Sequence, residues 1–307
     1  MKILLAALAA SLFAAPSFGQ GTHALSSARN VLNGLFPDQP QALEALELPV
    51  AVPASQARAF SDPNSQDDDG TTSLMRAAKE GQNEVLTAIL SQPGVKVDMT
   101  NSSGQTALMM AAISGRTEAA RILLKAKADP NLQDNAGTNA LMLAAYFGFT
   151  KTASALLEGG ARINSRDADG NTPLILAAQA GRAETVDRLA SVPGAELDAK
   201  NKIGTTALLE ASMMDFDSDK IAVLIDRGAD KNLAANYSKD ATTVVEDYTA
   251  LMVAAAYNNL PGVKILLDRK VNLNHRDRVD KKTALGIAKD GGSQELIDLL
   301  VAAGAQE

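Results

Sequence analysis

The sequence predicts an all-α solenoid built from helix–turn–helix units that are joined by short β-turn fingers. Three observations predict this fold. A Thr-x-Leu triplet recurs every 33 or 34 residues apart from one longer interval, a pair of small residues follows each triplet, and a turn-forming residue follows each pair. A fixed period of this length is typical of stacked repeats, in which each unit buries its apolar face against its neighbours.

Residues 1–19 are expected to be a secretory signal peptide. Lys2 is their only charged residue, and the apolar run 3–15 is shorter than the about 20 residues that a membrane-spanning helix needs. Ser17 and Gly19 are small residues suitably placed for cleavage after residue 19. The alternative is a buried N-terminal helix. We therefore expect a periplasmic or secreted protein without a membrane span. The pattern of the expected signal peptide suggests a bacterial periplasm.

Residues 20–66 do not share the repeat and are expected to form a helical cap followed by a linker. The segments 22–36 and 41–48 have amphipathic patterns that could cover the open N-terminal face of the stack. The stretch 49–69 contains prolines and a run of three aspartates, which are typical of a solvated linker.

The region 67–307 is expected to form about seven repeats. Each repeat is anchored by a threonine or, once, an asparagine, at Thr72, Thr106, Asn139, Thr172, Thr206, Thr249 and Thr283. Small residue pairs follow in most units, such as Ala111-Ala112 and Ala144-Ala145, and these should let neighbouring helices approach closely. Seven residues after each anchor leucine stands a residue that tolerates a left-handed backbone: Gly81, Gly115, Gly148, Gly181, Asp215, Asn258 and Gly292. The first helix of each unit should therefore end there, and the chain should reverse its direction.

This unit resembles the ankyrin repeat, and the run Thr172-Pro173-Leu174-Ile175-Leu176-Ala177-Ala178 carries the resemblance most clearly. The resemblance implies an ankyrin-repeat solenoid whose activity is protein–protein interaction. One departure is consistent, because the histidine that the family places after the leucine is replaced here by Met75, Met109, Met142, Ile175, Leu209, Met252 and Gly286. The apolar replacements should fill space between helices where the family forms hydrogen bonds.

An insertion near residues 236–247 lengthens the finger before the sixth unit, where the leucine spacing is 43 residues. The segment 242–245 has strand propensity, so the finger is expected to form an extended hairpin. Insertions in repeats often lie on the binding face. The alternative is a neutral expansion of the loop.

The composition disfavours enzymatic and nucleic-acid-binding functions. The chain has 307 residues with a net charge of −7, and a phosphate backbone would be repelled by such a surface. Cysteine is absent, which removes disulfides and thiolate chemistry, and of the two histidines His275 is expected in an exposed turn. We therefore expect no catalytic residues, no cofactor and no metal.

Candidate partner-binding residues stand at positions that vary freely in an ankyrin stack, on the concave face and the fingers. They are the bulky residues Ile113, Tyr146, Phe147, Met213, Met214, Tyr237, Tyr248 and Tyr257. Aromatic and methionine side chains are enriched in the cores of protein interfaces. The alternative is that Tyr146, Phe147 and Met213 pack against the turn of a neighbouring unit.

These observations favour a monomeric module that binds a protein partner with a basic surface. Exported members of the family suggest an accessory factor of an envelope enzyme, either in peroxide defence or as a regulator of a cell-wall hydrolase. A non-inhibitory scaffold and an effector that binds a host protein are the alternatives.

Overall fold

The computed structural model describes residues 62–213, 218–238 and 244–307, all of which belong to one compact unit, Arg58–Glu307. The expected signal peptide and most of the expected cap and linker lie outside the described residues. Within the described part, no helix is both long and apolar enough to cross a membrane.

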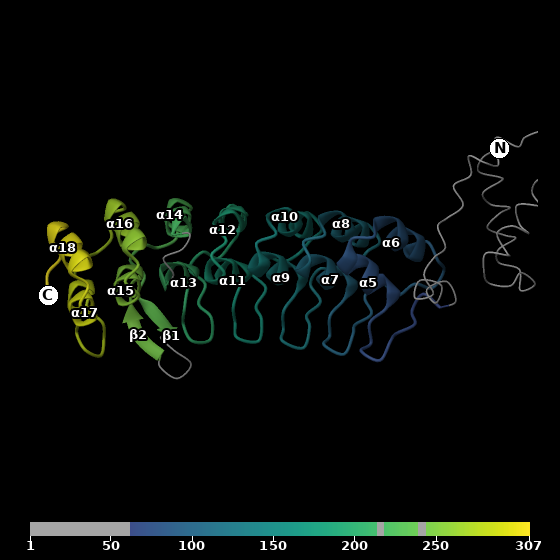
Figure 1. The fold of residues 1–307 in the computed structure, drawn as a ribbon, viewed down its shortest axis with the longest axis horizontal. Coiled ribbons are helices and arrows are strands. Elements are labelled where there is room, and N and C mark those ends of the chain that lie inside the picture. Colours follow the sequence, from purple (N-terminus) through teal and green to yellow (C-terminus); the bar gives the residue numbers. More distant parts are fainter. Residues whose placement is uncertain (1–61, 214–217, 239–243) are drawn as a thin grey trace, which may run out of the picture. The chain divides into compact units, whose positions relative to one another are not determined.

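The described residues form two layers of helices, as Figure 1 shows. The inner layer consists of α5 (Ser73–Glu80), α7 (Ala107–Ile113), α9 (Ala140–Phe147), α11 (Pro173–Gln179), α13 (Ala207–Met213), α15 (Ala250–Ala256) and α17 (Ala284–Gly291). The outer layer consists of α6 (Asn83–Leu90), α8 (Thr117–Lys125), α10 (Thr150–Glu158), α12 (Ala183–Ala190), α14 (Asp219–Asp226), α16 (Leu260–Asp268) and α18 (Gln294–Ala302). Each helix contacts its partner in the same unit and its counterparts in adjacent units. The predicted solenoid is confirmed.

Each inner helix begins at the anchor residue of its unit, which caps the helix N-terminus. The Thr72 hydroxyl accepts the backbone N–H of Met75 at 3.2 Å, and the Asn139 side chain accepts that of Met142 at 3.0 Å. The same bond is formed by Thr106, Thr172, Thr206, Thr249 and Thr283. An N-cap side chain of this kind is worth about 1 kcal/mol. The first residue of the repeated triplet therefore marks the N-terminus of each inner helix.

Wherever the structure describes it, the expected residue at or just after the end of an inner helix is left-handed. The backbone φ angle is 74° at Gly81, 78° at Gly148 and 52° at Asn258, whereas Asp215 lies outside the described residues. At Gly115 a second constraint applies, because a Cβ atom there would lie 2.5 Å from the ring of Phe149 in the next unit. Reversal of the chain and close contact between units both favour glycine at this position.

The core of the stack is made from small and aliphatic side chains. The alanine pairs of the inner helices are almost completely buried, and so are Met75, Met109, Met142, Ile175, Leu209 and Met252, which occupy the family's histidine position. The expectation that these apolar side chains fill space between the helices is confirmed. The sulfur of Met75 also lies 3.4 Å from the backbone nitrogen of Thr72, so it accepts a weak hydrogen bond there.

The fingers, which lead into the inner helices, are tied to one another by polar groups. An asparagine or aspartate at the base of each finger accepts a backbone N–H from the next unit, at Asn64, Asp98, Asn131, Asn164, Asp198, Asn232 and Asn274. At the tips, the Ser102 N–H donates to the Asp69 carbonyl at 2.9 Å, and Lys202 donates in the same way to Asp169. The fingers are thereby held at a fixed spacing.

The insertion before the sixth unit forms the predicted hairpin. Strand β1 (Ala235–Ser238) pairs antiparallel with β2 (Val244–Tyr248), and their register shifts between Ala235 and Tyr237. Residues 239–243 between the strands lie outside the described residues. Leu209, Ala235 and Val253 form a small core beneath the hairpin.

One polar cluster interrupts the apolar core between the fifth and sixth units. Lys220 is fully buried, and the fully buried Asn259 side chain donates to the Ser212 carbonyl at 3.1 Å. Glu210 lies on α13 near Lys220. Burial raises the pKa of Glu210 from 4.5 to about 7, although the positive charge of Lys220 lowers it in part.

We predict that Gly115→Ala lowers the free energy of unfolding more than Gly94→Ala does. Both glycines have a positive φ angle, 63° and 79°, so both substitutions introduce left-handed strain. Only Gly115 faces a neighbouring ring, whereas a Cβ atom at Gly94 would meet no atom within 4 Å. The additional loss at Gly115 should be about 1–3 kcal/mol in urea unfolding. Equal losses would contradict the close contact between units.

We also predict that stability falls as the pH rises from 4.5 to 7, and that Glu210→Gln reduces this fall. The folded chain keeps the Glu210 proton up to a pH of about 7, while the unfolded chain releases it near 4.5. Protonation therefore favours the folded state below pH 4.5, and this contribution is lost as the pH rises through 7, with an upper bound of about 3 kcal/mol. Unfolding free energies of both chains at pH 4.5, 6 and 8 check this. Parallel pH profiles would disprove it.

Candidate functional site

Three aromatic rings gather where the third unit turns from its inner to its outer helix. Tyr146 and Phe147 end helix α9 and are 45% and 41% exposed, and Phe149 follows after Gly148. The rings of Tyr146 and Phe147 meet edge to face with centroids 5.4 Å apart, and Phe147 stacks with Phe149 at 6.3 Å. We call Tyr146, Phe147 and Phe149 the aromatic cluster.

The backbone around the aromatic cluster is held by the neighbouring units. Gly148 adopts its left-handed conformation between the rings, and the Arg182 side chain of the fourth unit donates to the Tyr146 carbonyl at 3.5 Å. On the other side, Phe149 lies against Gly115 of the second unit. Aromatic side chains on a fixed backbone lose little conformational entropy when they bind a partner.

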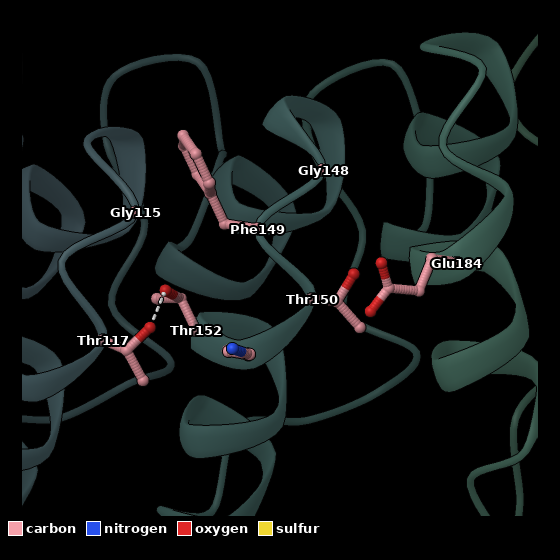
Figure 2. A pocket seen from close by; sticks show the side chains of 8 residues that line it. Gly115, Thr117, Gly148, Phe149, Thr150, Thr152 and Glu184 are labelled. Atoms are coloured by element: carbon pink, nitrogen blue, oxygen red, sulfur yellow. Dashed lines mark hydrogen bonds between the residues drawn. The ribbon is translucent and has the colours of Figure 1, made fainter.

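A shallow pocket of about 260 Å³ borders the aromatic cluster. Figure 2 shows Phe149 on one side of it and Glu184, at the start of α12, on the other. The hydroxyl groups of Thr117 and Thr152 are hydrogen-bonded to each other at 2.8 Å. The pocket therefore combines an aromatic wall with one carboxylate and the ammonium group of Lys151, and an amphipathic side chain of a partner would fit this combination.

An apolar strip continues from the aromatic cluster along the inner helices. Met110, Leu143 and Leu176 occupy equivalent positions on α7, α9 and α11, and all three are half-buried. Ile113 and Tyr146 lie three residues after Met110 and Leu143, so each shares a helix face with its partner. We call Met110, Ile113, Leu143, Tyr146 and Leu176 the apolar strip.

The other predicted residues are not gathered at this place. Tyr257, 37% exposed, follows α15 three units further along the stack. Met213 and Tyr248 are half-buried and pack against the small core beneath the hairpin. Met214 lies outside the described residues, and Tyr237 lies in β1 opposite Val245.

Sequence reasoning missed Phe149, Met110, Leu143 and Leu176. Phe149 stands where the second and fourth units have an arginine, so an aromatic residue in a polar position was the available signal. The strip residues share their position with Arg76 and Glu210 of other units, but also with the buried Val253 and Ile287, so the residue type at this position alone does not reveal an exposed strip.

The expectation for His275 was wrong. Its side chain is half-buried, and its Nε2 atom lies 2.9 Å from the backbone carbonyl oxygen of Asp247 and 3.6 Å from the Asp247 carboxylate. His275 thus links the seventh finger to the hairpin. Among the described residues, no group of three or more His, Cys, Asp or Glu side chains is placed to hold a metal ion.

Comparison with solved structures supports the fold. The chain is similar to the crystal structure of the human ASB11 ankyrin repeat domain, with a TM-score of 0.64 and 23% identity. The superposition covers 77% of this chain and 100% of that domain.

Sequence comparison identifies the family. A zebrafish (Danio rerio) protein, ankyrin repeat and SAM domain-containing protein 6, is 33% identical over 72 residues, which are 24% of this chain and 10% of that protein. The family described as ankyrin repeats (3 copies) matches residues 43–134, 141–235 and 231–307. The first match begins within the segment 20–66 that was expected to be a cap and linker. Because these matches cover most of its length, the chain belongs to the ankyrin-repeat family.

Proposed function

We propose that this protein binds a protein partner through the aromatic cluster and the apolar strip, and that it performs no catalysis itself. The observation that carries this proposal is the exposure of Tyr146 and Phe147, at 45% and 41%, in a chain with only 4% aromatic residues. Ankyrin repeats are a protein–protein interaction module, so the family supports a binding function.

The physical properties of the site suit recognition of another protein. Interface hot spots are clusters of aromatic side chains surrounded by contacts that exclude water. Here the exposed rings are joined by the half-buried strip, which supplies such surrounding apolar contacts. A standard interface of about 1,600 Å² in total would cover the strip, the aromatic cluster and the adjoining fingers.

The finer proposal concerns location and partner. Residues 1–19 have the pattern of a secretory signal, which supports a periplasmic or secreted protein. The net charge of −7 supports a partner with a basic surface. We propose that the partner is an envelope enzyme, of peroxide defence or of cell-wall hydrolysis, whose activity binding modulates. In the scaffold alternative, binding leaves that activity unchanged.

We predict that Tyr146→Ala/Phe147→Ala weakens partner binding at least about tenfold, because hot-spot aromatics contribute about 2 kcal/mol or more each. A matched control is Ile203→Ala, which removes another apolar side chain of 41% exposure at a finger tip. The partner would be isolated from an envelope extract with the wild-type chain, and its Kd measured with all three purified chains.

Equal affinity of the double variant and the wild-type chain would reject the aromatic cluster as the binding site. The catalytic rate of the purified partner enzyme, measured with and without this protein, distinguishes modulation of the enzyme from a scaffold role. A change in rate supports modulation, and an unchanged rate supports a scaffold.

A further inference from the structure

A second pocket, distinct from the aromatic cluster, lies between the third and fourth fingers. Its volume is about 610 Å³, within the range of ligand-binding clefts. Its polar lining comes from Asn131 and Gln133 on the third finger and from Arg162, Asn164, Ser165 and Arg166 on the fourth. The chain carries more acidic than basic residues, yet this lining contains two arginines and no carboxylate.

The two arginines differ in their partners. Arg166 is fixed by the carbonyl oxygens of Gly170 and Lys200, at 3.0 and 2.7 Å, and its charge is offset by Glu196 at 3.3 Å. Arg162 is exposed, and among the described residues no carboxylate lies within 4.0 Å of its guanidinium group. The pocket therefore carries one positive charge that is available to a ligand.

The two asparagine amides of the lining also favour an anion, whereas the Gln133 amide already donates both N–H groups, to the carbonyl oxygens of Gly137 and Arg166. The side-chain oxygens of Asn131 and Asn164 already accept backbone N–H groups at 2.9 and 3.0 Å, so they are satisfied within the protein. Their nitrogens donate to the carbonyl oxygens of Gly160 and Gly194, and each keeps a second N–H. Beside the free guanidinium, the lining thus offers further hydrogen-bond donors.

We propose that this pocket binds a carboxylate group. A guanidinium matches the two oxygens of a carboxylate in a bidentate arrangement, and the single available charge suits a single negative charge. The carboxylate is supplied either by a small organic acid or by a glutamate or aspartate of a protein partner. The bonds that fix Arg166, Asn131 and Asn164 hold the pocket in place before the ligand arrives.

The test is an NMR titration of the ¹⁵N-labelled full chain at constant ionic strength, with sodium chloride replaced stepwise by a probe. The probes are sodium butyrate, a capped peptide with one glutamate, and the same peptide with glutamine. We expect saturable amide shifts confined to residues 131–133 and 162–166 with at least one carboxylate probe. Arg162→Gln should weaken this binding about tenfold, because it removes the charged donor. Arg121→Gln, which alters an exposed arginine on α8, is the control and should bind as the wild type does.

Binding of butyrate alone supports a small organic acid as the ligand, and binding of the glutamate peptide supports an acidic side chain. Shifts that grow linearly without saturating, equal binding of the glutamine peptide, or unchanged binding by Arg162→Gln would each overturn the proposal. Tyr146→Ala/Phe147→Ala should leave this titration unchanged, so the outcome is independent of the proposed partner site.

Discussion

The close approach of neighbouring units is the constraint on which the rest of the structure depends. Ala144 and Ala145 of α9 are fully buried between adjacent inner helices, and the equivalent pairs of the other units up to the sixth are buried in the same way. No larger side chain fits such a contact without displacing a helix. The glycine at the end of the inner helix reflects the same requirement, since at Gly115 even one methyl group would meet the Phe149 ring.

This constraint determines where bulky residues can stand. A core assembled from alanine, leucine and methionine leaves little room for aromatic rings, so Tyr146 and Phe147 project from the end of α9. The fingers follow a different principle, because polar side chains and backbone groups hold them at a fixed spacing. The stack therefore presents an apolar surface on its inner helices and a donor-rich pocket between its fingers.

The repeat could be predicted from sequence because caps, small pairs and left-handed turns each depend on local residue type. Thr72 caps the start of α5 and Gly81 caps its end, and both can be predicted from residue type alone, without knowledge of the rest of the chain. The site could be predicted only in part. Exposure of Tyr248 and Met213 depends on the hairpin that packs against them, and the carboxylate pocket combines Asn131 with Arg162 of the next unit. Such contacts depend on tertiary packing that one unit's sequence does not contain.

The most direct test of this account introduces the same residue at two adjacent positions of α9. Ala145 is fully buried and Tyr146 is 45% exposed, so Ala145→Leu enlarges the core contact while Tyr146→Leu changes only the surface. The account predicts that Ala145→Leu lowers the free energy of unfolding in urea by about 1–3 kcal/mol, and that Tyr146→Leu changes it by about 0.5 kcal/mol or less. A tolerated Ala145→Leu, or an equal loss for Tyr146→Leu, would contradict it.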